Sequence, residues 1–251
     1  MTDQYYKRED GSYIRYRDIP GNFPISILYL HGMRSSMDSI KGKYAQEFAA
    51  QKNIPFVALD YTTMGKSSGT LKDFRTGACL NDIQDIIGQT IKDKPFIIVA
   101  SSFGGGLAFH IAKTYAPQVK GVLGISIYPD MLNDIWERLF TQKHRDYLMG
   151  GGVFEASEET KGNYFSYPMF TDAFDHQLLD KQIAYDGEVV LLQGDQDKIS
   201  PPDLAFKIKD LLTAEYVQIH VLKGYGHSFE KEHQLAHIGE SLAALINRVV
   251  K

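Results

Sequence analysis

The 251-residue chain is poor in cysteine and tryptophan, with one of each, and it lacks long apolar runs. A single cysteine, Cys79, excludes a disulfide within the chain and favours a reducing compartment. The first residues have no apolar stretch of the kind that signal peptides carry, and no run approaches the roughly 18 apolar residues of a membrane span. We therefore expect a cytoplasmic protein without a membrane span.

The chain also lacks an excess of basic residues. It has 27 Lys and Arg against 31 Asp and Glu, which gives a formal net charge of −4. No basic run or stripe is present, so nucleic acid is not an expected partner. A chain of this length buries enough surface to be stable without a disulfide or a structural metal, and we expect one domain over residues 1–251.

Strand-like apolar runs alternate with helical segments along most of the chain. A hairpin around Asp10-Gly11 comes first, and the alternation then begins. Buried apolar strands separated by helices predict an α/β protein with a mostly parallel central sheet and helices on both faces. The predicted strands are 25–30, 56–59, 96–100, 119–127, 188–192 and 216–222, and the predicted helices are 37–51, 80–91, 103–115, 203–212 and 233–250.

Residues 128–185 interrupt this alternation. The segment is rich in aromatic and charged residues and contains three consecutive glycines, Gly150 to Gly152, which could form a hinge. The strand–helix pattern resumes after it, so the sheet is completed by later residues. We therefore predict a small helical cap inserted within the domain, placed above the sheet.

The most informative motif is Ala100-Ser101-Ser102-Phe103-Gly104, between a predicted strand and a predicted helix. Small-x-Ser-x-Gly in this setting is typical of a nucleophile elbow. The turn is so tight that the residues two before and two after the nucleophile must be small. Ala100 and Gly104 satisfy this rule for Ser102, whereas Ser101 would be flanked by bulky Val99 and Phe103.

A serine nucleophile needs a base, an acid that orients the base, and donors for the oxyanion. Asp197 follows the strand 188–192 in Gly-x-x-Asp spacing and is the expected acid, with Asp195 as its competitor. His227, between glycine and serine after the last predicted strand, is the expected general base. The alternative base is His31, which stands in the wrong order along the chain.

The oxyanion donors are expected from two backbone amides. His31-Gly32-Met33-Arg34 directly follows the first central strand, where one such amide is usually supplied. The N–H groups of Met33 and Phe103 form the predicted pair, and His31 and Gly32 form the supporting loop.

These motifs, in this order, resemble those of the α/β-hydrolase superfamily over the whole chain. More narrowly, the chain is similar to the branch that contains the mitochondrial acyl-protein thioesterase, which also cleaves acyl glucuronides, and its bacterial relatives. The resemblance implies hydrolysis of esters or thioesters without a cofactor or metal. The matching segments are His31–Ser36, Leu59–Tyr61, Gly65–Gly69, Ser101–Gly105 and Pro129–Asp130.

We therefore predict a serine hydrolase that cleaves carboxylic ester or thioester bonds of apolar acyl substrates, either small molecules or acylated proteins. Two alternatives stay open at this point. The same triad serves peptidases, lipases and carbon–carbon hydrolases, because one fold hosts many reactions. A binding protein that kept the fold without catalysis is the second alternative, and the oligomeric state is not indicated by the sequence.

Overall fold

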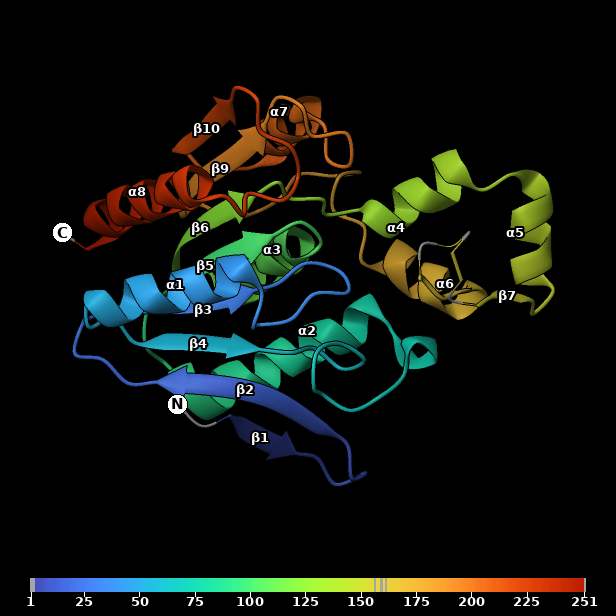
Figure 1. Cartoon of the computed structure of the whole chain (residues 1–251), viewed down its shortest axis with the longest axis horizontal. Helices are drawn as coiled ribbons and strands as arrows, with labels where there is room; N and C mark the ends of the chain where they lie inside the picture. The colour runs from blue at the N-terminus through green and yellow to red at the C-terminus, as the bar shows by residue number, and fades with distance from the viewer. Residues whose placement is uncertain (1–2, 156, 159, 161, 251) are drawn as a thin grey trace.

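The computed structural model describes residues 3–155, 157–158, 160 and 162–250. Its centre is an eight-stranded sheet in the order β1-β2-β4-β3-β5-β6-β9-β10, parallel except where β2 pairs with β1 and with β4 (Figure 1). The α/β class predicted from the alternating pattern is confirmed. The strands of this sheet are β1 Gln4–Lys7, β2 Tyr13–Ile19, β3 Ser26–Leu30, β4 Phe56–Leu59, β5 Phe96–Ser101, β6 Val119–Ile125, β9 Glu188–Gly194 and β10 Val217–Leu222.

Helices cover both faces of this sheet, as the apolar character of its central strands requires. Helices α1 and α8 lie over one face, and α2, α3 and α7 pack on the other (Figure 1). Along β5, Ile97 and Val99 face the first layer while Ile98 and Ala100 face the second. These helices are α1 Ile40–Gln51, α2 Thr76–Ile86, α3 Gly104–Thr114, α7 Pro202–Leu211 and α8 Glu232–Val249.

The segment between β6 and β9 extends beyond the carboxyl ends of the parallel strands (Figure 1). Its rings pack on one another around Trp136 and Phe170, whose centroids are 5.0 Å apart. This is where the predicted cap, residues 128–185, was expected, and its role as a cap stays a prediction. The elements of the segment are α4 Met131–Asp134, the π-helical turn η3 Ile135–Leu139, α5 Gln142–Met149, β7 Val153–Phe154, β8 Phe165–Ser166 and α6 Tyr167–Asp175.

Some predicted boundaries were wrong, and local contacts explain why. The helix predicted over 37–51 begins at Ile40, because the Ser39 side chain caps it. The helix predicted over 80–91 begins at Thr76, and its last turn is the π-helical η2 Ile87–Ile91. The strands β7 and β8 were missed because two residues each are too short for a periodic pattern.

Two further features of the described residues concern the predicted hinge and membrane association. The N–H groups of Gly150, Gly151 and Gly152 donate to carbonyls of the last turn of α5, which ends there, and a hinge at this point stays a prediction. Within the described ranges, none of the helices combines the length and the apolar character that a membrane span requires.

Candidate active site

The nucleophile candidate Ser102 lies in a sharp turn between β5 and α3. Its φ is +53°, in the left-handed region that costs an L-residue conformational energy. A Cβ on Gly104 would come within 2.6 Å of the Leu30 carbonyl oxygen, so α3 can pack this closely on the end of β3 only with glycine there. Ala100 is fully buried. The packing of the turn therefore requires a glycine at position 104, and the small Ala100 lies in the buried interior on its other side.

Three side chains from three separate loops meet at this turn. The Oγ of Ser102 lies 3.0 Å from Nε2 of His227, and Nδ1 of His227 lies 2.8 Å from Oδ2 of Asp197. Both distances are within hydrogen-bonding range. The structure thus brings the predicted nucleophile, base and acid into one chain of hydrogen bonds, which is the arrangement that activates a serine hydroxyl.

The carboxylate of Asp197 is held by its own loop as well as by His227. Its Oδ1 accepts the N–H groups of Ile199 and Ser200, each at 2.9 Å, and its Oδ2 also accepts Nε2 of Gln193 at 3.2 Å. Burial acts to raise the pKa of Asp197, but the hydrogen bonds from His227 and the two amides outweigh it and the pKa is lowered. Asp197 is therefore ionised at neutral pH and fixed in position.

The competing residues lie elsewhere. Asp195 accepts the N–H of Gly224 at 2.6 Å, and this contact joins two loops at the surface. Ser101 is the last residue of β5 and is buried. His31 is fully buried beside the nucleophile turn, but its side chain bonds the adjacent carbonyl of Gly32 and not Ser102.

The predicted oxyanion amides flank the nucleophile. Ser35 N–H donates to the Gly32 carbonyl at 3.2 Å, which makes a β-turn with Met33 as its second residue. A Cβ on Gly32 would lie 3.2 Å from the Cβ of Ser102, so this turn touches the nucleophile. Within the described part of the chain, the N–H groups of Met33 and Phe103 donate to no backbone carbonyl outside the helices and strands, and their role as oxyanion donors stays a prediction.

Sequence reasoning assigned no role to Asp60. The structure places this residue in contact with the loop that carries Gly32 and Met33. Asp60 is fully buried, and its carboxylate accepts the Met37 N–H at 2.8 Å and the Lys66 N–H at 2.9 Å. A Cβ on Gly65 would come within 2.2 Å of this carboxylate. The segments Leu59–Tyr61 and Gly65–Gly69 were singled out in the sequence analysis. Residue spacing alone, however, does not show that the Asp60 carboxylate contacts the loop that follows β3.

One apolar cavity lies between the segment above the sheet and the loops that follow β3 and β4, and a second lies within that segment. The smaller, about 30 Å³, has Met33, Phe74 and Leu132 among its lining residues. The larger, about 370 Å³, is lined by Phe140 and Phe154 among others. The residues common to both linings are Ile135, Asn163 and Phe165.

A larger cavity, whose lining residues are mostly polar or charged, lies between α4 and α7. Its volume is about 500 Å³, and its lining includes Tyr128, whose N–H donates to the Ser102 carbonyl, and Pro201, which follows the Asp197 loop. Among the described residues no group of three or more His, Cys, Asp or Glu side chains could hold a metal ion.

Comparisons with known proteins agree with this fold. The family model described as alpha/beta hydrolase fold matches residues 25–148. The mitochondrial palmitoyl-protein thioesterase ABHD10 of Mus musculus is 27% identical over 230 residues, which are 91% of this chain and 77% of the mouse protein. The human protein of the same name is 24% identical over 247 residues, 98% of this chain and 80% of its own length.

Solved structures show the same fold at lower identity. Mouse alpha/beta hydrolase domain-containing protein 10 superposes with a TM-score of 0.88 at 22% identity, over 99% of both chains. A protein from Agrobacterium vitis S4 gives 0.89 at 22% identity, over 98% of this chain and all of the other. Est1E from Butyrivibrio proteoclasticus, with ferulic acid bound, gives 0.82 at 16% identity over 98% and 99%. The chain is an α/β-hydrolase-fold protein related to the ABHD10 palmitoyl-protein thioesterases, with the fold of bacterial hydrolases.

Proposed function

We propose that this protein is a serine hydrolase that cleaves carboxylic ester or thioester bonds through an acyl-enzyme intermediate. The observation that carries the proposal is the chain of hydrogen bonds from Ser102 through His227 to Asp197, at 3.0 and 2.8 Å. A buried carboxylate held in a fixed direction keeps the imidazole oriented toward the serine hydroxyl.

Each step follows from this geometry. Nε2 of His227 takes the proton of Ser102 Oγ while the oxygen attacks the acyl carbon, and the carbonyl electrons move onto the oxygen facing Met33 and Phe103. When the tetrahedral intermediate collapses, His227 gives the proton to the departing alkoxide or thiolate. Water then repeats the sequence on the acyl-enzyme, so that a free acid leaves and the serine is restored.

The substrate class is inferred from the two apolar cavities. The smaller is lined by the oxyanion residue Met33, and the larger continues outward past Ile135 and Phe165. The lining is mostly Met, Phe, Leu and Ile, with Arg34, His144, Thr160 and Asn163 as its polar members, and it favours an apolar acyl group over a sugar or a polar peptide. The names of the ABHD10 relatives, palmitoyl-protein thioesterases, support an acyl group on a protein as one form of the substrate, and a small acyl ester or thioester is the other form we propose.

A peptidase, a carbon–carbon hydrolase and a non-catalytic binding protein are the alternatives that this proposal must exclude. The first two would use the same three residues, whereas the third would leave Ser102 unreactive. The cytoplasmic location expected from the sequence stays a prediction.

A fluorophosphonate probe tests the proposal directly, since it forms a covalent bond with an activated serine. We expect labelling of the wild type and of Ser101→Ala, and none of Ser102→Ala with its fold intact by circular dichroism. A binding protein would not be labelled at all. A panel of p-nitrophenyl esters, acyl thioesters and peptides then identifies the bond type, and turnover of peptides alone would contradict the proposed function.

A further inference from the structure

The loop from His31 to Ser39, here called the oxyanion loop, is attached at both ends to two consecutive residues that follow β4. The Tyr61 hydroxyl donates to the His31 carbonyl at 3.1 Å, at the start of the loop. The Asp60 carboxylate accepts the Met37 N–H at 2.8 Å, near its end. Met33, the predicted oxyanion donor, lies between these two attachments.

The Asp60 attachment is rigid because its other contacts leave the carboxylate no room to move. It is 0% exposed, and it accepts Nη1 of Arg15 and the N–H of Lys66, each at 2.9 Å. Gly65 packs directly against it, so closely that no side chain fits there. A carboxylate with charged and amide donors on several sides is held far more strongly than one with a single bond.

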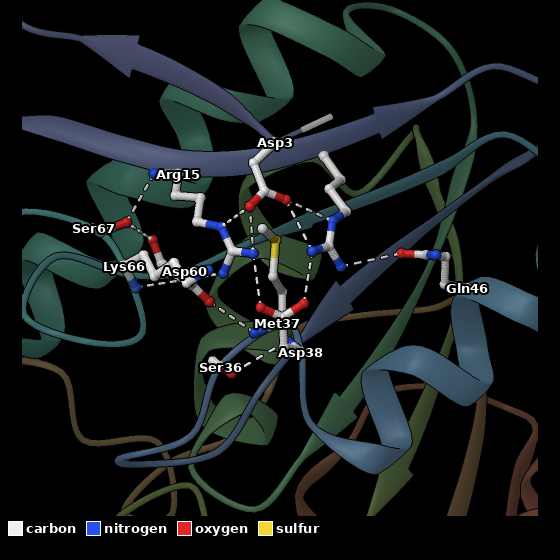
Figure 2. A network of polar contacts seen from close by, with 10 residues as sticks. Asp3, Arg15, Ser36, Met37, Asp38, Gln46, Asp60, Lys66 and Ser67 are labelled. Atoms are coloured by element: carbon white, nitrogen blue, oxygen red, sulfur yellow. Dashed lines mark hydrogen bonds and ion pairs between the residues drawn. The ribbon is translucent and has the colours of Figure 1, made fainter. Parts of the chain in front are cut away.

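Arg15 connects this carboxylate to a second point of the same loop. The guanidinium is almost completely buried and contacts Asp38 at 2.7 Å and Asp3 at 2.6 Å, as well as Asp60 (Figure 2). Asp38 belongs to the oxyanion loop and is also paired with Arg17 at 2.7 Å. The last residues of the loop are thus fixed both through their backbone and through a side chain.

The Tyr61 hydroxyl bonds the peptide group next to the one that carries the predicted oxyanion donor, and the Tyr61 ring contacts the His31 side chain that bonds the latter. The Tyr61 ring stacks on His31 with centroids 4.1 Å apart, and Nδ1 of His31 lies 2.8 Å from the carbonyl oxygen of Gly32. Burial keeps this imidazole neutral and lowers the pKa of His31 to about 4, so the proton on Nδ1 is donated to that carbonyl. This carbonyl and the Met33 N–H belong to one planar peptide, so fixing one fixes the direction of the other.

We propose that Asp60 and Tyr61 are positioning residues that hold the oxyanion loop so that the Met33 N–H is aimed at the developing oxyanion. Neither residue touches the substrate; both act through the loop. The inference rests on the proposed serine-hydrolase function, because it concerns the stabilisation of that reaction's tetrahedral intermediate. An oxyanion donor acts well only when it is aligned before the reaction.

The decisive variant is Tyr61→Phe, with Tyr185→Phe as its matched control. Both tyrosines are buried, and both donate their hydroxyl to a backbone carbonyl, Tyr185 to Val119 at 3.3 Å at the start of β6. We expect both variants to lose thermal stability to a similar degree. Only Tyr61→Phe should lower kcat, by about tenfold with KM changed less than twofold, since misalignment affects the transition state more than the bound substrate.

A second measurement separates positioning from a general loss of order. An alkylboronic acid bonds to the serine oxygen and forms a tetrahedral adduct that occupies the oxyanion site. Its inhibition constant should rise in Tyr61→Phe by the same factor as kcat falls, and should not change in Tyr185→Phe. Asp60→Asn, which places an amide NH₂ among the donors of Arg15 and Lys66, should show the same coupled losses if it folds.

The inference is overturned if Tyr61→Phe keeps the wild-type kcat and boronate affinity while it loses stability as Tyr185→Phe does. In that case the hydroxyl only stabilises the fold. This result is distinct from failure of the proposed function, in which the wild type itself would neither hydrolyse acyl esters nor be labelled at Ser102. That second outcome would remove both proposals together.

Discussion

Gly32 and Ser102 are in such close contact that a methyl group on Gly32 would lie 3.2 Å from the Ser102 Cβ and 3.8 Å from its Oγ. The first residue comes from the loop after β3 and the second from the turn after β5. These strands are parallel neighbours in the sheet, with Leu30 paired to Ala100. The contact therefore sets the distance between the nucleophile and the amide of the next residue, Met33.

Gly32→Ala should lower kcat/KM by about 10- to 100-fold, because Ser102 sits in a strained turn that cannot move to accept the methyl group. The melting temperature should fall only slightly, since the contact is confined to two residues. Ester hydrolysis and thermal unfolding on the same preparation test this. Wild-type activity in Gly32→Ala would show that the loop can shift without harm to the oxyanion donors.

Asp197→Asn should reduce kcat by about 10⁴-fold, because the amide cannot keep His227 in the correct tautomer. The control is Asp195→Asn, two residues earlier. Its oxygen can still accept the N–H of Gly224, so we expect a change of less than about threefold. Equal losses in the two variants would mean that the whole turn, and not one carboxylate, supports the reaction.

The buried His31 should make the protein less stable in mild acid. In the folded state burial lowers the pKa of His31 to about 4, whereas in the unfolded chain it is near 6.5. Between these values the unfolded state takes up a proton that the folded state does not, so stability falls as the pH falls from 6.5 to 4. This contribution is fully present above pH 6.5.

Urea unfolding at pH 7 and pH 5 measures this effect. Wild type should lose about 2 kcal/mol more than His31→Gln between the two values, because the variant has no imidazole to titrate at this position. Parallel losses in the two proteins would show that His31 is protonated in the folded state or exposed to water.

The apolar cavities predict a dependence on acyl-chain length. Each methylene buried contributes up to about 0.8 kcal/mol, so kcat/KM should climb with chain length until the cavities are filled. A series from two to sixteen carbons, on oxygen and sulfur leaving groups, measures this.

Ile135→Trp should shift the optimum to shorter chains, because Ile135 lines both cavities. Leu139→Trp is the matched control: this side chain is 70% exposed and lines only the outer cavity, so a smaller shift is expected. A flat series, or the same shift in both variants, would count against a continuous acyl site.

Much of the sheet and the meeting of the three site residues could be predicted from the sequence, since both depend on local rules. Apolar runs alternating with helices require a parallel sheet, and parallel strands present their carboxyl ends at one edge. Ser102, Asp197 and His227 each follow such a strand, so they were expected to lie together. The tight turn then distinguishes Ser102 from Ser101, because only one has small flanks. The catalytic roles of these residues stay predictions.

Other features were decided only by the tertiary structure. The Asp60 carboxylate reaches the Met37 amide 23 residues away, and Tyr61 reaches the His31 carbonyl 30 residues away, by side-chain contacts between two loops. The larger apolar cavity lies within the aromatic segment, so its shape depends on how the rings there pack against one another. The loop contacts and the ring packing leave no periodic pattern in the chain, because both depend on three-dimensional distances and not on residue spacing. The sequence by itself thus determined the α/β class and the site candidates, whereas tertiary packing decided what holds the oxyanion loop and what shape the acyl site has.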